Sequence, residues 1–196
     1  MSGPTSAAQV SSADRETVQA YLCADLPEGL RWQASAFVRT QWPEVDRGAG
    51  REPYAAELEP VHVVLADGDL LLGYAGVVRF SIAHGGQEWV VDGLGRVFVF
   101  PGARGGGRGR RLVDAATAVV REGGADLGAL LCEPGLRPFY AGSGWAAVDP
   151  GVVIDRGDGG APFRVPGPTM LLPVSARARA AWTTFEQSPL TVPLAW

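Results

Sequence analysis

The stretch VFPGARGGGRGRRLV, residues 99–113, combines residue types that bind phosphate groups. It holds five glycines and four arginines, and it joins an apolar run to an apolar-periodic segment typical of a helix. The first turn of a helix exposes unpaired N–H groups with partial positive charge, and glycine lets the backbone approach an anion closely. Arginine adds forked donors. The stretch therefore predicts a binding site for a diphosphate.

The spacing within this stretch is R-x-x-G-x-G, formed by Arg104, Gly107 and Gly109. It differs from the dinucleotide fingerprint, which needs a G-x-G-x-x-G register, a following strand and a ribose-binding acid. All 17 cationic side chains of the chain are arginines. The absence of lysine excludes a Walker-type phosphate loop and lysine Schiff-base chemistry.

At these residues the sequence resembles the GNAT superfamily of acyl-coenzyme A N-acyltransferases, whose pattern is a strand, a proline and then R-G-x-G-x-G-x-x-L. The matching residues are Val99, Pro101, Arg104, Gly105, Gly107, Gly109 and Leu112. Arg108 departs from the aliphatic residue usual there. The resemblance implies that the coenzyme A pyrophosphate binds to Arg104, Gly105, Gly106, Gly107, Arg108 and Gly109. It also implies that the pantetheine and acyl carbonyl bind to the backbone of Val97, Phe98 and Val99.

A second match lies in residues 127–145, where the sequence reads F-Y-x-x-x-G-W from Phe139 to Trp145. In many members of the family the tyrosine at this position, here Tyr140, is the general acid that protonates the coenzyme A thiolate. A phenol with an ordinary pKa near 10 suits this task, because it is protonated at pH 7. The alternative is that Tyr140 is a half-buried packing residue.

Within the family, the sequence most resembles the aminoglycoside 2'-N-acetyltransferases, over roughly residues 35–196. The resemblance rests on L-G-A-L at 127–130, L-L-P-V at 171–174 and the final Trp196. It implies that the last residues reach the substrate pocket, where the terminal carboxylate of Trp196 takes part in amine binding. A weaker resemblance to rhizobial nodulation N-acyltransferases rests on residues 93–99 and on Arg31-Trp32.

Several acids of the aminoglycoside enzymes are missing. Gly95 and then Arg96 stand where those enzymes have a strand glutamate, and Leu194 stands where they have an acid before the final tryptophan. VPGPT at 165–169 replaces a carboxylate-rich stretch. A polycationic substrate needs several carboxylates to replace its hydration, so we expect little acetylation of aminoglycosides.

Another general base is then required. Asp92 and Glu133 are the principal candidates, with Glu88 as a third. Arg96 suggests either an acceptor with its own negative charge or a structural ion pair with Asp92, and we favour the ion pair. We expect His62 to pack in the core.

The order of predicted elements, antiparallel strands followed by strand–helix–strand–helix, indicates an α+β fold with a mixed sheet. The resemblance adds the GNAT fold, with flanking helices and a split between the two middle strands. Helices are expected over 12–25, 107–122, 137–141 and 176–186, and a helix or strand over 30–40. Strands are expected over 61–65, 70–80, 89–91, 95–100, 127–131, 152–154 and 170–174. We expect a flexible N-terminus over 1–11 and a single domain over 12–196, with a C-terminal extension at 175–196.

Composition limits the partners. The net charge of −4 argues against nucleic acid as a partner, and two histidines and two cysteines predict no metal site. The absence of a secretory pattern and of a long apolar run predicts a cytoplasmic protein without membrane attachment. A homodimer is left open.

The combined expectation is an enzyme that transfers an acetyl group from acetyl-coenzyme A directly to a primary amine of a small molecule. Two alternatives remain at this point. One is a non-catalytic acyl-coenzyme A-binding sensor or scaffold. The other is an acyltransferase that uses a longer-chain or carrier-protein donor.

Overall fold

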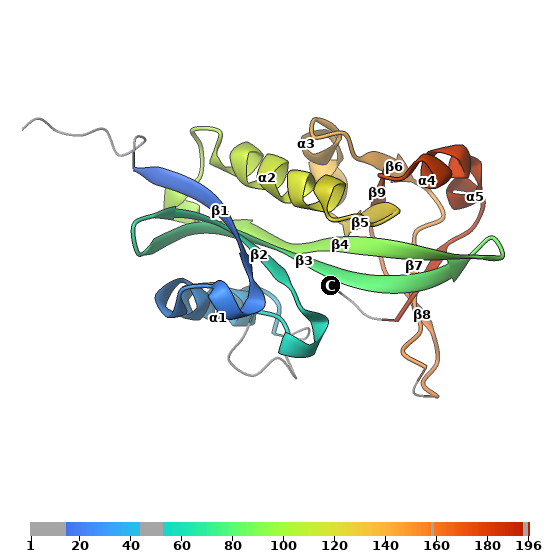
Figure 1. Cartoon of the computed structure of the whole chain (residues 1–196), viewed down its shortest axis with the longest axis horizontal. Helices are drawn as coiled ribbons and strands as arrows, with labels where there is room; N and C mark the ends of the chain where they lie inside the picture. The colour runs from blue at the N-terminus through green and yellow to red at the C-terminus, as the bar shows by residue number, and fades with distance from the viewer. Residues whose placement is uncertain (1–14, 44–52, 158, 194–195) are drawn as a thin grey trace, which may run out of the picture.

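Seven strands form the central sheet of the computed structural model, which describes residues 15–43, 53–157, 159–193 and 196 (Figure 1). Their order across the sheet is β1-β2-β3-β4-β5-β9-β6. Neighbouring strands are antiparallel except for the parallel pair β4 and β5. The strands are β1 Glu16–Leu22, β2 Val61–Asp67, β3 Leu70–His84, β4 Gln87–Val99, β5 Leu127–Leu131, β6 Ala146–Val148 and β9 Thr169–Pro173. The sheet is mixed, as predicted.

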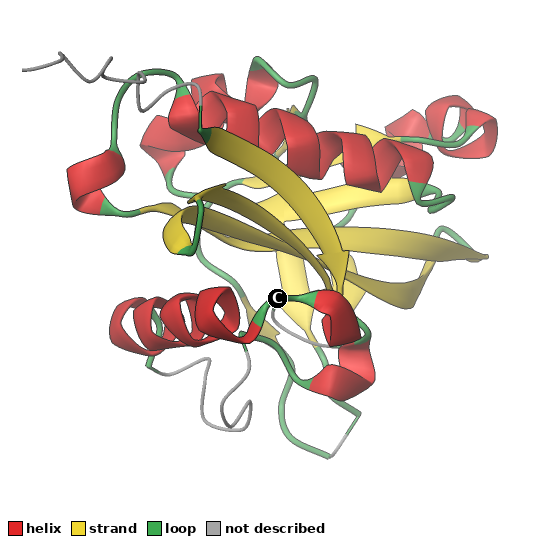
Figure 2. Cartoon of the chain, turned by 60° about the vertical axis from the view of Figure 1, so that its left-hand side comes forward, coloured by secondary structure: helices red, strands yellow, loops and turns green. Residues whose placement is uncertain are grey.

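A smaller sheet of three strands lies beside the main sheet, in the order β10-β7-β8. Its strands are β7 Val152–Ile154, β8 Phe163–Arg164 and β10 Leu190–Val192. The helices are α1 Glu28–Gln41, α2 Arg108–Glu122, α3 Arg137–Ala141, α4 Ala176–Ala180 and α5 Trp182–Gln187. Helix α1 covers one face of the main sheet, while α2 and α3 cover the other (Figures 1 and 2).

The two faces of the sheet carry separate apolar clusters. On the face of α1, the helix buries side chains spaced three or four residues apart, Leu30, Ala34 and Val38, because this spacing puts them on one side. On the other face, α2 buries a similar stripe, Leu112, Val113, Ala116 and Val120. The sheet therefore separates two apolar cores, one on each face.

Strand β4 contains a β-bulge in its second half. Tyr74 of β3 pairs with Phe98, and Gly76 pairs with Gly95, so a two-residue step on β3 faces a three-residue step on β4. The extra residue is Arg96, whose φ of 51° lies in the left-handed region. Because of this bulge, the positions of Gly95 and Arg96 both face Tyr54 on the α1 side.

The pairing between β4 and β5 ends just before the bulge. Four residue pairs join the two strands, from Val91 with Leu127 to Leu94 with Leu130. Strand β4 then continues to Val99, and within the described residues no strand pairs with this edge of β4 from Gly95 onward. The predicted split between the two middle strands lies here.

Residues 12–14 of the helix predicted over 12–25 lie outside the described residues. The prediction is wrong for residues 16–22, which form β1. Thr17, Val18 and Tyr21 favour a strand, and seven antiparallel residue pairs with β2 fix this segment at the edge of the sheet, a long-range interaction that the local sequence pattern does not reveal. The prediction over 30–40 is resolved as helix. The strands predicted over 89–91 and 95–100 are one bent strand, β4.

Other elements agree closely with the predictions. Helix α2, strand β5 and helix α3 lie where the sequence places them. The last predicted helix divides at Ala181 into α4 and α5. Three short strands, β6, β8 and β10, were not predicted. The flexible terminus expected over 1–11 lies outside the described residues.

His62 offers a test of this core. Its Nδ1 lies 2.7 Å from the hydroxyl oxygen of Tyr74, and burial together with the charge of Arg31 lowers its pKa from 6.5 to about 4. Between these values the unfolded chain binds a proton that the folded chain does not, so stability falls as the pH drops from 6.5 toward 4. We expect a loss of up to about 1.4 kcal/mol per pH unit.

The measurement is denaturant unfolding at several pH values between 6.5 and 5, where most carboxylates remain ionised. The His62→Gln variant should have a flatter dependence of the unfolding free energy on pH than the wild type. Equal slopes in the two proteins would contradict this assignment.

Candidate functional site

Three consecutive glycines shape the loop between β4 and α2. Gly105, Gly106 and Gly107 have φ values of 89°, 58° and 75°, which side-chain-bearing residues rarely adopt. The N–H groups of these glycines and of Gly109 make no hydrogen bond to described residues. The loop therefore presents a group of free donors at the N-terminus of a 15-residue helix, an arrangement that binds anions.

Most loop arginines bind other parts of the protein. Arg108 donates from Nε to Glu16 of β1 at 2.9 Å, and its N–H donates to the carbonyl of Gly105 at 3.3 Å. The hydrogen bond from Arg108 lowers the pKa of the Glu16 carboxyl. Arg111 also contacts this carboxylate, at 3.1 Å. The Arg108 side chain therefore joins the loop to β1, and the prediction that Arg108 binds the pyrophosphate stays a prediction. Arg104 is exposed, and its Nε donates to the main-chain carbonyl of Val99 at 3.3 Å.

The predicted pantetheine segment occupies the open edge of β4. Phe98 stacks on Phe37 of α1 with ring centroids 4.1 Å apart, while Val97 and Val99 pack in the cluster on the α2 side. The side chains of residues 97–99 are thus held in the apolar clusters on the two faces of the sheet. The backbone along this edge remains open to an extended ligand lying beside the strand.

Tyr140 lies in α3, on the α2 side of the sheet, and its side chain is 6% exposed. Burial, with a smaller contribution from Cys132, raises its pKa to about 12. Trp145 supports α3 by donating from Nε1 to Thr117 of α2 at 3.0 Å. Tyr140 is therefore both packed and fully protonated at neutral pH, the state that a proton donor requires.

The two principal candidates for the general base differ in environment. Asp92 is 2% exposed, and Arg79 donates to both of its carboxylate oxygens, at 2.8 and 2.9 Å. The predicted ion pair between Asp92 and Arg96 is therefore wrong, because Arg79 is the residue opposite Asp92 in the β3–β4 pairing. With both oxygens occupied, Asp92 is a poor base. Glu133 is exposed just after the end of β5.

Gly95 is the point where the C-terminal segment meets β4. A Cβ atom at Gly95 would lie 2.6 Å from the main-chain carboxyl carbon of Trp196 and 2.8 Å from the hydroxyl oxygen of Tyr54. The Trp196 indole donates to the carbonyl of Leu94 at 3.1 Å. A glutamate side chain at Gly95 would therefore collide with this packing.

Arg96 lies next to this contact. Its guanidinium carbon is 3.9 Å from the centroid of the Tyr54 ring. Tyr54 was not predicted as a site residue, because it lies outside the predicted strands and helices and belongs to no motif. The glycines at 93 and 95 are the only sequence signal of a close approach here, and Trp196 fills the space above Gly93 as well.

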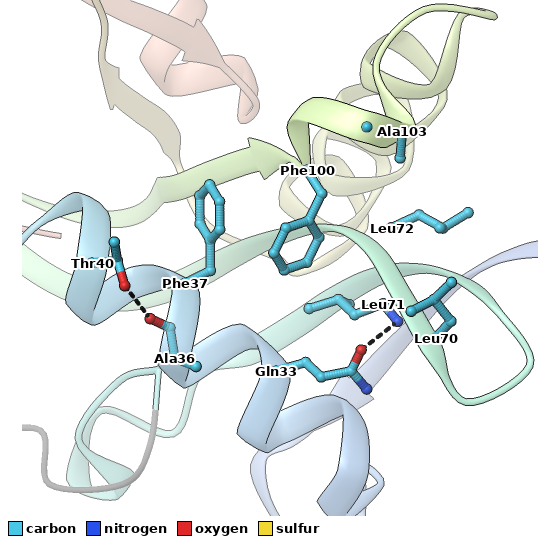
Figure 3. Close-up of a pocket in the computed structure, with 10 residues that line it drawn as sticks. Gln33, Ala36, Phe37, Thr40, Leu70, Leu71, Leu72, Phe100 and Ala103 are labelled. Atoms are coloured by element: carbon cyan, nitrogen blue, oxygen red, sulfur yellow. Dashed lines mark hydrogen bonds between the residues drawn. The ribbon is translucent and has the colours of Figure 1, made fainter.

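An apolar pocket of about 640 Å³ adjoins the glycine loop on the α1 side (Figure 3). Phe37 and Phe100 project into it, and Gln33 is fixed by accepting a hydrogen bond from the N–H of Leu71 at 3.0 Å. Its lining is completed by Ala36, Thr40, Leu70, Leu71, Leu72, Gly102 and Ala103. The sequence analysis did not predict this pocket, because three separate segments form it.

Two further findings concern the described residues. None of the described helices is long and apolar enough to cross a membrane. No group of three or more histidine, cysteine, aspartate or glutamate side chains in the described part of the chain is arranged to hold a metal ion.

The split strands and the glycine loop define an acyl-coenzyme A N-acyltransferase. A family model described as an acetyltransferase (GNAT) domain matches residues 19–148. The chain therefore belongs to the GNAT acetyltransferase family and is an N-acetyltransferase. No curated protein matches its sequence.

Solved structures share the fold. An acyl-CoA N-acyltransferase from Pseudomonas aeruginosa is 20% identical, with 80% of this chain and 98% of that chain covered and a TM-score of 0.53. Escherichia coli ElaA is 20% identical, with 80% and 97% covered and a TM-score of 0.54. An aminoglycoside 6'-N-acetyltransferase complexed with coenzyme A is 19% identical, with 82% and 98% covered and a TM-score of 0.58. The resemblance to the 2'-N-acetyltransferases stays a prediction.

The loop can be tested with Gly107→Asp. A carboxylate beside the free N–H groups should repel a diphosphate and weaken coenzyme A binding by at least about tenfold, or about 1.4 kcal/mol. Calorimetric titration with coenzyme A measures the affinity.

Gly124→Asp is the matched control, because Gly124 also has a positive φ and open space around it but lies beyond the other end of α2. Its affinity for coenzyme A should equal that of the wild type. Equal affinities for the Gly107 variant and the wild type would refute the loop assignment.

Proposed function

We propose that this N-acetyltransferase transfers the acetyl group of acetyl-coenzyme A directly to a primary amine of a small molecule. The observation that carries the proposal is the protonated, buried Tyr140 in α3. Its neighbour Phe139 and Val99 of β4 both lie within 4 Å of the position that a Cβ atom on Gly109 would take. The free N–H groups of Gly105, Gly106 and Gly107 would hold the pyrophosphate, and the edge of β4 would hold the pantetheine.

In the proposed reaction, the neutral amine nitrogen attacks the thioester carbonyl carbon. A C–N bond forms, and a backbone N–H near Val99 stabilises the negative charge that develops on the carbonyl oxygen. The C–S bond then breaks, and Tyr140 gives its proton to the departing thiolate. The amine proton leaves to Glu133, directly or through water, so that charge and protons balance.

Cys132 bears on the choice between direct and covalent transfer. Burial raises the pKa of its thiol, so the nucleophilic thiolate is scarce at neutral pH. This supports attack by the amine on the thioester itself. The charge of Cys132 contributes to the raised pKa of Tyr140, so the two side chains lie near each other.

The test of Tyr140 is Tyr140→Phe. Removing the hydroxyl should slow turnover by about ten- to ten-thousandfold and leave coenzyme A affinity nearly unchanged. The measurement is thiol release from acetyl-coenzyme A with a panel of primary amines, a kanamycin-type aminoglycoside included. Tyr21→Phe, on the remote strand β1, is the control and should keep full activity.

A wild-type rate in the Tyr140 variant would return this residue to a packing role. If the wild type binds acetyl-coenzyme A but acetylates no amine of the panel, the alternative of a non-catalytic sensor or scaffold is favoured. The glycine in place of the strand glutamate is the feature that already favours that alternative.

A second candidate function is transfer of a longer acyl chain, and the apolar pocket beside the glycine loop favours it. The pocket is lined by Phe37 and Phe100 but not by residues 97–99, where the thioester would lie. Because Phe98 stacks on Phe37, a long chain would have to disturb this stack to reach the pocket. We therefore favour acetyl as the group transferred.

A comparison of acyl donors distinguishes acetyl transfer from transfer of a longer acyl chain. We expect acetyl-coenzyme A to react at least about tenfold faster than octanoyl-coenzyme A with the same amine, because a closed apolar site discriminates by methylene count. The Phe37→Ala variant should have a smaller rate difference between the two donors, because it removes the ring that stacks on Phe98. Faster reaction of the octanoyl donor with the wild type would establish the second candidate.

A further inference from the structure

The carboxylate of Glu16 binds two arginines in the first turn of α2. Glu16 is the first residue of β1, and its side chain is 4% exposed. Its Oε1 accepts a hydrogen bond from Nε of Arg108 at 2.9 Å, and its Oε2 accepts one from Nη1 of Arg111 at 3.1 Å. The main-chain carbonyl of Glu16 also accepts a hydrogen bond from Arg111, at 3.2 Å. The edge strand of the sheet is thus tied to the start of the helix.

Arg108 connects this carboxylate to the glycine loop at two points. Its Nη1 donates to the carbonyl of Ala103, where the loop begins, at 3.1 Å. Its main-chain N–H donates to the carbonyl of Gly105, within the loop, at 3.3 Å. The residue that Glu16 holds therefore fixes two carbonyl groups of the loop.

The glycine loop needs such support from outside. Glycine has the widest choice of backbone conformations, and Gly105, Gly106 and Gly107 follow one another directly. Their free N–H groups form an anion site only while the backbone keeps them in the positions described above. Ordering the backbone of one residue costs roughly a factor of ten in an equilibrium constant. A loop that is already ordered by the protein does not lose this factor when the ligand binds.

The same contacts account for the departure of Arg108 from the aliphatic residue usual in the GNAT family. An aliphatic side chain at this position can be held only by apolar packing. The Arg108 side chain is 24% exposed, and that of Glu16 is almost buried, so the pair is largely shielded from water. Hydrogen bonds between charged groups are stronger in such surroundings than in water.

Two roles of Glu16 have to be distinguished, and they predict effects of opposite sign. If Arg108 leaves Glu16 to bind a diphosphate, Glu16 competes with the ligand, and its removal strengthens binding. If Arg108 stays on Glu16 and holds the loop, the removal of Glu16 weakens binding. The contacts favour the second role. All three guanidinium nitrogens of Arg108 donate within the protein, two to Glu16 and one to Ala103, and a move toward the ligand would break these bonds.

We propose that Glu16 is a positioning residue for the donor, which acts through Arg108 to hold the glycine loop in the shape that receives the diphosphate of coenzyme A. This inference rests on the proposed function, because it concerns the loop that would hold the pyrophosphate. It assigns part of the affinity for an anionic donor to an acidic residue.

The experiment measures coenzyme A affinity by calorimetric titration. The variants are Glu16→Gln, which keeps the length of the side chain without its charge, Glu16→Ala, Arg108→Gln and the double variant Glu16→Gln/Arg108→Gln. Turnover is measured as kcat/KM with acetyl-coenzyme A and with S-acetylpantetheine, a donor that lacks the diphosphate. The acceptor is an amine that the wild type acetylates.

Asp67→Asn is the matched control. Asp67 is paired with Glu16 across the edge of the sheet, and its carboxylate forms an ion pair with Arg15 at 3.7 Å. This variant removes the same charge from the neighbouring strand and leaves the Glu16–Arg108 contact in place. Its affinity for coenzyme A should be no weaker than that of the wild type.

Glu16→Gln should weaken coenzyme A binding by about tenfold, and Glu16→Ala by at least as much. The kcat/KM for acetyl-coenzyme A should fall by a similar factor, while the kcat/KM for S-acetylpantetheine should be unchanged. The double variant should bind no more weakly than the weaker single variant, because both residues act through one contact. Melting temperatures show whether each variant is folded.

Three results would overturn the inference. Tighter binding of coenzyme A to Glu16→Gln would assign Arg108 to direct contact with the diphosphate. Unchanged binding in Glu16→Gln and Glu16→Ala would show that the loop needs no support from β1. An equal loss of kcat/KM with both donors would give Glu16 a role in general stability. Failure of the proposed function has a different signature: no amine is acetylated, while Glu16→Gln still weakens coenzyme A binding.

Discussion

The short parallel pairing between β4 and β5 is the constraint on which the site depends. After four residue pairs β4 bends at the bulge and continues without a partner among the described residues on that edge. Under the proposed function, the open edge would supply backbone groups for an extended donor molecule, and the loop that follows would supply the anion site. If β4 and β5 had paired over their full length, this edge of β4 would be closed to a ligand.

The two faces of the sheet carry different candidate site residues. The α2 side carries Tyr140, the proposed proton donor, which packs in the core beside α2. The α1 side carries Arg96, Tyr54 and Trp196, which lie around Gly95. Under the proposed function, a donor bound along the split would meet Tyr140 on the α2 side and the acceptor on the α1 side. This separation allows each side to vary in sequence without disturbing the other.

The sequence predicted the parts whose signals are local. The glycine loop, α2, β5 and α3 were placed correctly because each combines turn residues with a clear apolar period. Strand β1 was mistaken for a helix, since its stability comes from pairing with β2 rather than from its own pattern. The partners of Asp92, Arg96 and Arg108 could not be derived either. Such contacts join residues distant in the chain, and sheet register selects them.

Gly95 and Trp196 are about a hundred residues apart in the sequence but are in close contact in the fold, so the residue type at one position restricts the other. Any residue larger than glycine at 95 needs the space that the Trp196 main chain occupies, so the segment carrying Trp196 must then take another path. We expect that a homologue with a side chain at the position of Gly95 does not place a tryptophan where Trp196 lies here. A strand acid at position 95 would therefore require a different path for the C-terminal segment.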